Sequence, residues 1–461
     1  MPILAAYLLP HPPLVIPEIA KGKEKTISKT YETYENIAHE IALLEPETII
    51  FISPHAESYT DYFQIADAEV GLGSFGAYKA HNVNFRLFYD RQLISSIISI
   101  VKKNNFPAGS EKGKEIYLDH GTMVPLYFIN KFYRNFKAVR LGVSGLSLST
   151  HYRFGQMVNE AIDISNKKVV VICSGDLSHV VNENSPYGFK EEGAIYDKQL
   201  LKVLEKGNFG ALLSWNKQNL SAAQECAHRS ITLMAGILDR LSVTSKLCSY
   251  ENLTGIGYAI MSFKVIGENA SRAFLELYRS KQSFAVKIES DNADDYARLA
   301  RLAIEKYVKT GQIPTLTNEW PSVFLNSKNG VFVTLYKDGE IRGCMGSVKP
   351  LKKNLGTEII NSAIASASLD ARFPKVSSEE LPFISIAVDV ISSPIPILSV
   401  SDLDPKKYGI VVEFGEKRAA LLPNLPSIET GEEQILMAKK KAQIKKGEDV
   451  QLYRFSVSHH I

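Results

Sequence analysis

The chain has 461 residues, enough for two or three domains of the usual size of about 150 residues each. Hydrophobic residues make up 45% of it, charged residues 22% and aromatic residues 10%, a balance typical of globular proteins with an ordinary core. The net charge of +3 is too small to indicate nucleic-acid binding, and no apolar run is long enough to span a membrane. The four cysteines have neither metal-like nor disulfide-framework spacing, so we expect reduced thiols in a cytoplasmic protein.

Three apolar segments predict strands, and each is followed by a turn that carries a histidine. These pairs are 3–9 with His11, 48–52 with His55, and 169–173 with His179. Prolines beside His11 and His55 disfavour continuation of a strand or helix there. Because ligand-binding groups of an open α/β sheet gather beyond the carboxyl ends of its strands, we expect the three histidines to meet in one pocket. A metal site is the first interpretation of such a pocket.

The remaining segments up to about residue 266 predict further helices and strands in alternation. Apolar periodicity predicts helices over 27–44, 90–104 and 150–164, strands over 137–143 and 258–265, and loops over 56–83. The S-x-x-Q pattern at 221–224 has the form of a capping box and predicts a helix through Leu241, with Glu225 in its first turn. The alternation predicts an α/β domain with a central sheet flanked by helices.

The second part of the chain has a different organisation. We place the first domain at 1–266, a polar linker at 267–291 and the second domain at 292–461. Patterns in the second domain predict helices over 296–308 and 355–368, hairpins over 331–348 and 408–422, a lysine-rich helix near 439–446 and a last strand over 451–457. Strands and helices mix there without regular alternation, which predicts a smaller α+β domain.

Two histidines and one carboxylate on one side of a metal form the ligand set of non-haem iron(II) oxygenases. His11 and His55 are the nitrogen ligands in this interpretation, and Glu225 is the preferred carboxylate. An acidic residue in a first helical turn is also favoured by the helix dipole alone, which gives Glu225 a purely structural alternative. The neighbouring Cys226 is the other candidate, and its sulfur would favour a softer metal such as zinc or copper(I).

Two further histidines are candidate catalytic residues. His179 stands in a polar turn with Asp176 and Ser178, which suits a general acid or base that titrates near neutral pH. The alternative is a surface histidine beside a capping residue. His120 precedes Gly121, which permits close approach of a substrate, and we predict a substrate-binding role for it. Three other histidines are expected to be structural or exposed: His39, His81 and His151.

Residues 1 to about 266 resemble the LigB-type (class III) extradiol dioxygenase family, which includes the Memo proteins. Four motifs carry the resemblance: Pro-His-Pro at 10–12, Ser-Pro-His at 53–55, Asp-His-Gly at 119–121 and Ser-Gly-Asp-Leu-Ser-His at 174–179. The resemblance implies that His11, His55 and Glu225 bind iron. It also implies that His179 is the acid/base. Memo proteins carry Cys-Gly where this chain has Cys226 and Ala227, so Cys226 stays the alternative third ligand.

Residues from about 292 to 461 resemble the AMMECR domain family. The motifs are Ile-Arg-Gly-Cys-Met-Gly at 341–346, Asp-Ala-Arg-Phe-Pro at 370–374, Glu-Leu at 380–381 and Ser-Pro-Ile-Pro at 393–396. We expect Cys344 in the first motif to be a buried thiol, because no histidine lies near it in sequence to act as a base. The fusion of the two domains resembles the proteins of the AmmeMemoRadiSam system, which implies a radical-SAM enzyme as partner.

Two functions follow as expectations. The first is an extradiol ring-cleavage dioxygenase that uses iron(II) to act on a small catecholic or related aromatic substrate with O₂. Iron(II) is the expected metal of the site, and zinc is the alternative metal. The second is a metal- or ligand-binding module without oxygenase activity that works with the radical-SAM partner in protein or RNA modification. The sequence has no membrane-spanning segment and no clear signal of nucleic-acid binding. Both functions are compatible with a homo-oligomer.

Overall fold

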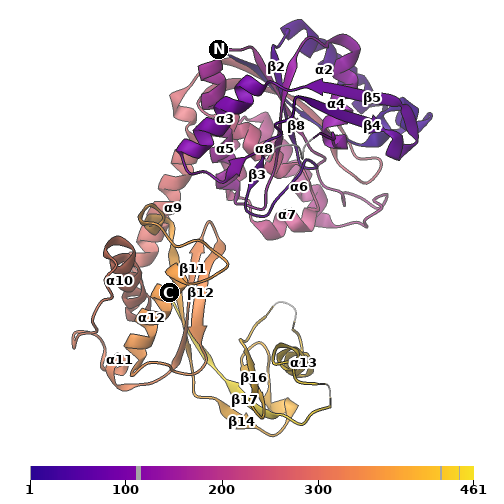
Figure 1. The fold of residues 1–461 in the computed structure, drawn as a ribbon. Helices are drawn as coiled ribbons and strands as arrows, with labels where there is room; N and C mark the ends of the chain where they lie inside the picture. Colours follow the sequence, from indigo (N-terminus) through magenta and orange to yellow (C-terminus); the bar gives the residue numbers. More distant parts are fainter. Residues whose placement is uncertain (1, 111–115, 426–427, 446) are drawn as a thin grey trace. The chain divides into compact units, whose positions relative to one another are not determined.

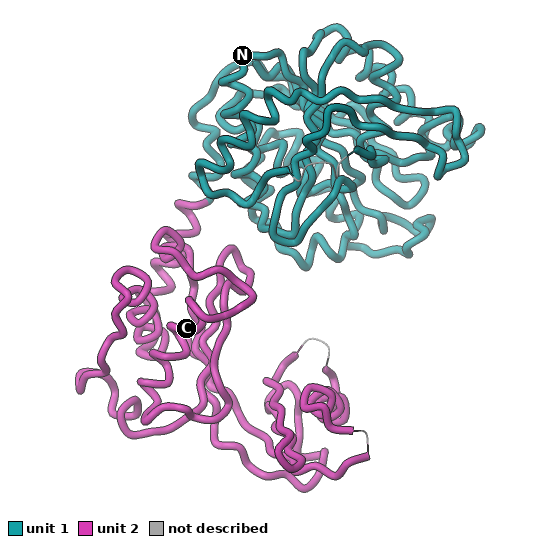
Figure 2. Tube along the Cα trace, in the orientation of Figure 1, with its two compact units in different colours: residues 1–278 teal, residues 279–461 magenta. Residues whose placement is uncertain are grey.

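The computed structural model describes residues 2–110, 116–425, 428–445 and 447–461. The chain forms two compact units, Met1–Tyr278 and Arg279–Ile461 (Figure 2). In the parts of the chain that the structure describes, no helix is both long and apolar enough to cross a membrane.

Helix α9 (Phe274–Asp291) occupies most of the segment 267–291 that we assigned to a linker, and the division between the units falls within it. The polar sequence there is amphipathic, because Leu275 and Val286 are buried while most of its charged residues are exposed. Apolar residues at such spacing favour a helix over an irregular linker.

A six-stranded sheet forms the centre of the first unit, in the order β7-β2-β8-β1-β10-β9 (Figure 1). Its strands are β1 (Ile3–Leu9), β2 (Thr48–Ser53), β7 (Lys137–Gly142), β8 (Val169–Ser174), β9 (Leu241–Glu251) and β10 (Tyr258–Glu268). The first four run parallel, and β10 and β9 extend the sheet beyond β1 in antiparallel fashion. Strands β2 and β8 are buried along their whole length, which requires helices on both faces. The five strands predicted for this domain are confirmed.

Helices cover both faces of this sheet. They are α1 (Pro17–Ala20), α2 (Ser28–Leu44), α3 (Arg91–Lys103), α4 (His120–Phe132), α5 (Leu148–Ser165), α6 (Glu191–Glu205), α7 (Lys217–Ala223) and α8 (His228–Ile237). Helices α2 and α4 pack together on one face, and α3, α5 and α8 pack together on the other (Figure 1). The predicted helices over 27–44, 90–104 and 150–164 correspond to α2, α3 and α5. The predicted α/β class is confirmed.

The prediction of loops over 56–83 is wrong in part. The segment contains β3 (Phe63–Gln64) and the hairpin of β4 (Val70–Phe75) and β5 (Ala80–Phe88), and β3 pairs with β6 (Ala108–Gly109). Glycines weaken the strand signal of β4, but close packing requires them: a Cβ at Gly71 would lie 2.7 Å from the Leu118 side chain. A Cβ at Gly73 would lie 2.5 Å from Met123. Glycine therefore marks close approach here and not a loop.

The single helix predicted over 221–241 is also wrong, and the correction changes the site. Helix α7 ends before Gln224, which takes the left-handed conformation (φ 51°), and α8 begins three residues after Glu225. The cap of α7 is Asn216, so the S-x-x-Q pattern lies at the end of that helix instead of before one. Glu225 and Cys226 consequently lie in a connection between two helices.

The second unit holds two four-stranded sheets, β12-β11-β13-β18 and β14-β17-β15-β16. The strands are β11 (Gly330–Lys337), β12 (Glu340–Ser347), β13 (Ser385–Ile391), β14 (Ile395–Ile397), β15 (Gly409–Phe414), β16 (Lys417–Leu421), β17 (Gln451–Phe455) and β18 (Val457–His460). The helices are α10 (Asp295–Thr310), α11 (Ser322–Asn326), α12 (Leu355–Ser368) and α13 (Gly431–Lys441). Helices α10 and α12 pack against the first sheet and α13 against the second. This confirms the predicted α+β class.

Both predicted hairpins of the second unit are present. Asp338 and Gly339 have φ values of 54° and 77°, the positive pair that a tight hairpin turn needs, and Gly415 has φ 57°. The single strand predicted over 451–457 is wrong at its end. Strand pairing is interrupted at Ser456, so β17 and β18 belong to different sheets. The C-terminal segment 451–460 therefore connects the two sheets of this unit.

Candidate metal centre

Five side chains lie together beyond the carboxyl ends of β1, β2 and β8, and we call them the strand-end cluster. They are His11, His55, His120, His179 and Cys226. His11 follows β1, His55 follows β2 and His179 follows β8. Because these strands are parallel neighbours, they bring three distant segments to one edge of the sheet. The structure thus brings His11, His55, the alternative ligand Cys226 and the predicted acid/base together, and their roles stay predictions.

His11 is buried and is held by groups at the carboxyl end of β8 and in the turn after it. Its backbone N–H donates to Asp176 Oδ1 (2.8 Å), and its ring Nδ1 lies 2.8 Å from Ser174 Oγ. Burial lowers the pKa of His11 to about 3, so the ring is neutral near pH 7. When Nδ1 donates its proton to the Ser174 hydroxyl, the lone pair of Nε2 faces the cluster.

His55 faces His11 from the exposed turn after β2. The two Nε2 atoms lie 3.0 Å apart, and the ring centroids lie 4.7 Å apart at an interplanar angle of 82°. Burial, and after it the charge of His120, lowers the pKa of His55 as well. Two neutral imidazoles that turn lone pairs toward one another repel unless a proton or a cation lies between them, so this pair suits a metal ion.

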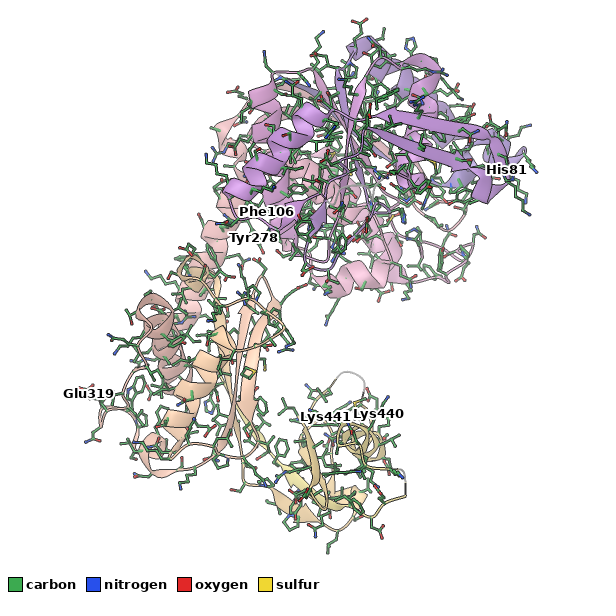
Figure 3. All side chains as sticks on the ribbon, viewed as in Figure 1. His81, Phe106, Tyr278, Glu319, Lys440 and Lys441 are labelled. Carbon is green, nitrogen blue, oxygen red and sulfur yellow. The ribbon has the colours of Figure 1, made fainter. Side chains whose placement is uncertain are left out.

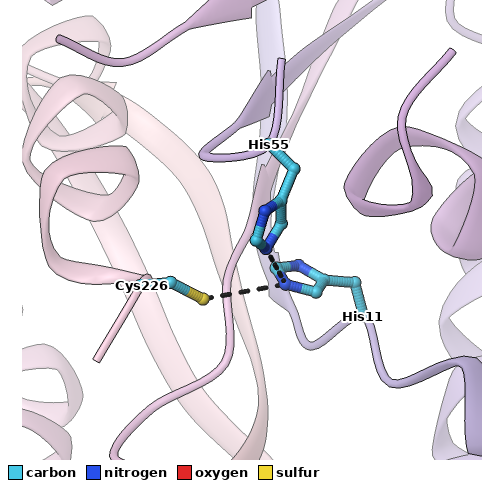
Figure 4. A group of neighbouring side chains, drawn as sticks. All are labelled: His11, His55 and Cys226. Carbon is cyan, nitrogen blue, oxygen red and sulfur yellow. Dashed lines mark hydrogen bonds between the residues drawn. The ribbon is translucent and has the colours of Figure 1, made fainter. Parts of the chain in front are cut away.

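Cys226 completes the group from the connection between α7 and α8. Its Sγ lies 3.7 Å from His11 Nε2, and the ligand atoms of His11, His55 and Cys226 all lie within 4.8 Å of one another (Figure 4). The Asp176 N–H donates to Sγ (3.2 Å). Gly175 makes this approach possible, because a Cβ there would lie 2.5 Å from the residue after Cys226. Burial raises the pKa of the Cys226 thiol, whereas coordination to a metal would deprotonate it.

The Glu225 carboxylate lies next to this group in sequence but has a different partner. Its Oε2 accepts a hydrogen bond from the His228 N–H (2.6 Å) at the start of α8. A helix start has backbone N–H groups without intrahelical partners, and this carboxylate satisfies one of them. Burial raises the pKa of Glu225, and the Arg229 charge opposes that shift. The donor set that the structure brings together is therefore two histidines and a thiol, and Glu225 caps a helix.

His120 is the first residue of α4 and lies beside both imidazoles. Its ring centroid is 4.2 Å from that of His55 and 5.1 Å from that of His11. Asp119 caps α4 and accepts from the Ser53 hydroxyl (2.5 Å), with Arg140 Nη1 3.2 Å away. Burial alone would raise the pKa of Asp119, but the Arg140 charge and these hydrogen bonds hold it below its usual value. Asp119 is thus a charged group that fixes where His120 stands.

His179 is the half-buried member of the strand-end cluster that follows β8, and its Nδ1 contacts the Gln224 carbonyl. This contact requires a proton on Nδ1 and leaves Nε2 as the basic nitrogen. A positive charge on His179 would lower the pKa of His11, so the two rings are within electrostatic reach. Asp176 is the residue that sequence reasoning missed as part of the site: its Oδ2 lies 3.9 Å from His11 Nε2, and burial raises its pKa. The sequence signal for it was a carboxyl group three residues before a strand-end histidine.

The donor set fits a transition metal. Imidazole nitrogen and thiolate sulfur are the usual ligands of zinc, copper and iron centres, and the buried carboxyl of Asp176 adds a nearby oxygen. The thiol departs from the two-histidine, one-carboxylate set and makes the group softer. Among the residues that the structure describes, no other three His, Cys, Asp or Glu side chains come together in this way.

The glycine-containing motif of the second unit is held by contacts within that unit. Arg342 donates twice to Glu380 (2.9 and 3.0 Å), and Lys337 donates to the same carboxylate (2.8 Å). The half-buried Cys344 accepts from the Thr334 hydroxyl (3.2 Å), and its N–H donates to Asp370 (2.9 Å). Cys344 was expected to be buried and lies partly exposed, because β12 is an edge strand of its sheet.

The remaining predicted structural histidines lie away from these groups. His151 is buried, with Nδ1 2.9 Å from the Ser147 carbonyl and Nε2 3.2 Å from the Ser144 N–H. His39 is exposed and contacts Phe132 edge-on. His81 is exposed in the first residues of β5, at the far end of the hairpin (Figure 3).

Two family models match successive parts of the chain. The family model described as the catalytic LigB subunit of aromatic ring-opening dioxygenase matches residues 5–261, and the AMMECR1 model matches residues 297–460. Protein CA_C1420 of Clostridium acetobutylicum is 37% identical over 462 residues, which covers 98% of both chains. A protein of Thermotoga maritima is 44% identical over 167 residues, 36% of this chain and 96% of its own length.

Two solved structures also match. Protein PH0010 of Pyrococcus horikoshii covers 36% of this chain and 88% of its own, with 32% identity and a TM-score of 0.33. Protein JW3007 of Escherichia coli K12 covers 56% of this chain and 99% of its own, with 12% identity and a TM-score of 0.41. Since the first family model matches more than half of the residues, and the Clostridium relative matches both domains, the chain belongs to the LigB family and carries an AMMECR1 domain after its LigB domain.

Proposed function

We propose that the LigB domain is a metal-dependent dioxygenase that opens the ring of a catecholic or related aromatic substrate, with iron(II) as its metal. The observation that carries the proposal is the convergence of two neutral histidines and a thiol, flanked by His120 and His179, at one edge of a parallel sheet. Membership of the LigB family supports the same reaction class. Such sites at strand ends are where open α/β sheets bind their ligands.

Iron(II), when bound, would supply the redox chemistry that lets O₂ react with an aromatic ring. His11, His55 and Cys226 would hold it, and the Ser174 hydroxyl would keep the His11 lone pair directed at it. His179 would take a phenolic proton at Nε2, because the Gln224 carbonyl keeps its Nδ1 protonated. It would return that proton as an acid in a later step.

His120 would orient the substrate. Burial, and after it the charge of His11, lowers the pKa of His120, so the ring is neutral and one of its nitrogens is free to donate a hydrogen bond. The cap that Asp119 makes on α4 holds the ring in place next to His55. A neutral hydrogen-bond donor beside the metal ligands suits a phenolic or phenolate oxygen.

An anaerobic experiment tests the proposal. The purified full chain is loaded with iron(II), mixed with a panel of substituted catechols and then exposed to air, and absorbance is followed for coloured ring-fission products. We expect one or more catechols to turn over in the iron-loaded protein and none in the metal-free protein. Stoichiometric iron with no turnover of any catechol would contradict the dioxygenase function.

A second function is favoured by one observation, the thiol of Cys226 in the position where an iron oxygenase has a carboxylate. We propose as the alternative that the LigB domain binds a softer metal without oxygenase activity and works with a radical-SAM enzyme on a protein or RNA substrate. Metal analysis of the protein as isolated distinguishes the two. Tightly bound zinc, no catechol turnover and co-purification with a radical-SAM enzyme encoded beside its gene would support the alternative.

A further inference from the structure

The β4–β5 hairpin leaves one of its two edges open. On the β4 side, Leu72 N–H donates to the Ile116 carbonyl (2.6 Å) and Leu118 N–H donates to the Leu72 carbonyl (2.8 Å), so the chain covers that edge. In the described parts of the chain, the β5 side meets the main sheet at Tyr89, just past the end of the strand. There Asp90 N–H donates to the Ala138 carbonyl of β7 (2.7 Å). The length of β5 before that point has no neighbouring strand on this side among the described residues.

The backbone hydrogen bonds show which β5 residues direct their N–H and C=O groups toward the open edge. Tyr89 N–H donates toward β4, whereas its neighbour Asp90 donates away from β4. Directions alternate along an antiparallel strand, so Asn84 and Arg86 turn their N–H and C=O groups away from β4, as Asp90 does. The register agrees, because Arg86 pairs with Leu72, whose own groups also point away from the partner strand. Within the described parts of the chain, no backbone group bonds to these groups of Asn84 and Arg86.

A groove of about 580 Å³ runs along this edge. One wall is the whole run Asn82–Phe88 of β5, and the other is one face of α4 with the turn after it, where Tyr127, Lys131 and Arg134 follow at helical spacing. At about 3.3 Å per residue, the β5 wall is about 20 Å long, which matches an extended peptide of about six residues. No member of the strand-end cluster lines the groove.

The charges of the groove determine which kind of strand fits it. Arg86 and Arg134 are exposed and have no carboxylate partner within the described residues. The acidic residue of the lining, Glu18, keeps its negative charge, because its hydrogen-bond donor, the Tyr127 hydroxyl (2.9 Å), is neutral. These two arginines against this one carboxylate leave the lining positive, since the third cation, Lys131, is paired with Glu35. The groove therefore has unneutralised positive charge beside unsatisfied backbone groups, which favours an acidic occupant.

A second copy of this chain is a poor occupant. Strand β5 contains Arg86 and no acidic residue, so pairing two β5 edges would bring like charges together. We propose that the open edge of β5 binds an extended, acidic segment of a partner protein as an added strand. Phe88, 49% exposed with the Arg86 guanidinium 5.1 Å from its ring centroid, would contact apolar side chains that alternate with the acidic ones.

Peptide binding to the full chain tests the proposal. The probe is a fluorescent peptide of about ten residues in which glutamate and valine alternate, and the control replaces glutamate with lysine. We expect the glutamate peptide to bind at least about tenfold more tightly, by fluorescence anisotropy, and to weaken as salt is added. Arg134→Glu should reverse this preference, because it inverts the charge of one wall.

Arg86→Pro separates strand addition from simple charge attraction. Proline removes an outward N–H and no β4–β5 hydrogen bond, and edge strands tolerate it, so the fold and the bound metal should be unchanged. The matched variant Arg86→Ala loses the same charge but keeps the N–H. We expect Arg86→Pro to bind the glutamate peptide at least about tenfold more weakly than Arg86→Ala. If Arg86→Pro fails to fold, a peptide N-methylated at alternate residues tests the same hydrogen bonds and should lose binding to the unaltered chain.

Three results would overturn the proposal. The first is no binding of the glutamate peptide at about millimolar concentration, where even weak strand addition is detectable. The second is equal affinity of Arg86→Pro and Arg86→Ala together with normal binding of the N-methylated peptide. The third is a dimer of the unaltered chain that Arg86→Pro converts to a monomer, which would assign the edge to a second copy.

Discussion

Each of the two units holds a cluster of ionisable side chains, but the charges in the two clusters are balanced in different ways. In the LigB domain, His11, His55 and Cys226 turn nitrogen and sulfur atoms toward one another, and the carboxyl of Asp176 lies 3.9 Å from His11 Nε2. In the AMMECR1 domain, Arg342 is neutralised by Glu380 in a two-bond pair. The first arrangement leaves nitrogen and sulfur lone pairs that can bind a metal ion. In the second, the carboxylate already accepts hydrogen bonds from its own cationic partners. The residue types alone therefore do not distinguish a ligand-binding site from a structural ion pair.

The pKa shifts of His11 in the first unit and Glu380 in the second have different causes. Burial, and after it the charge of His55, lowers the pKa of His11 to about 3, and the nearby Asp119 carboxylate does not offset these effects. Burial of Glu380 acts to raise its pKa, but hydrogen bonds from Arg342 and Lys337 outweigh it and lower the pKa to about 2. The first unit therefore provides neutral side chains that can act as ligands. The second provides an ion pair whose charges balance each other.

The largest expected effect is loss of the metal. His11→Ala or Cys226→Ala should abolish stoichiometric metal binding, because each removes one of three converging donors. The fold should survive, since the first unit has a large core of its own. Elemental analysis after dialysis against trace metal measures the effect, and Arg342→Ala in the other unit is the matched control that should keep full occupancy. Full occupancy in His11→Ala would remove it from the ligand set.

The next effect concerns rate without loss of metal. His179→Ala should lower turnover of any catechol substrate by about 10²–10⁴-fold, because a general acid/base moves protons in the transition state. Metal content should stay unchanged. The control is His39→Ala, which removes an exposed histidine outside the cluster and should leave turnover intact. Release of the metal from His179→Ala would make His179 a ligand instead.

The ion pair of the second unit predicts a pH dependence of stability. The pKa of Glu380 is lower in the folded chain than its ordinary value of 4.5, so its contribution is fully present above about pH 4.5. It is lost as pH falls toward about 2, where the folded carboxylate takes up a proton. Hydrogen exchange of the β11 and β12 amides in the full chain measures this local stability.

Glu380→Gln serves as the comparison for that pH profile. The variant should lose about 1.5–3 kcal/mol of local stability near pH 7, the usual range for hydrogen bonds to a charged group. It should also lose the fall in stability between pH 4.5 and 2. A profile identical to that of the unaltered chain would show that the pair is not stabilising.

The smallest effect concerns the residue beside the thiol. Glu225→Ala should keep the metal and destabilise the first unit by about 0.5–2 kcal/mol, because its carboxylate satisfies a backbone N–H at the start of α8. Denaturant unfolding gives the stability, and metal analysis of the same sample gives the occupancy. If Glu225→Ala released the metal while Cys226→Ala retained it, the ligand assignment would be reversed.

Much of the strand-end cluster could be predicted from local sequence. An apolar run that stops at proline or at polar residues marks both a strand and its carboxyl end, so the positions of His11, His55 and His179 followed from short segments. The hairpin of β4 and β5 could not be predicted in this way. Its glycines are needed because Leu118 and Met123 pack against them, and those contacts are distant in sequence.

The sequence by itself determined that several histidines stand at the ends of parallel strands, because strand formation and termination depend on neighbouring residues. Only the tertiary structure decided that the Cys226 sulfur, and not the Glu225 carboxylate, lies beside His11. Gln224 ends one helix in a left-handed conformation, and Gly175 lets the following connection press against the turn after β8. Adjacent residues in such a connection direct their side chains differently, so the sulfur reaches His11 while the carboxylate reaches the start of α8. That choice depends on contacts between segments about 50 residues apart in the chain, which no local pattern encodes.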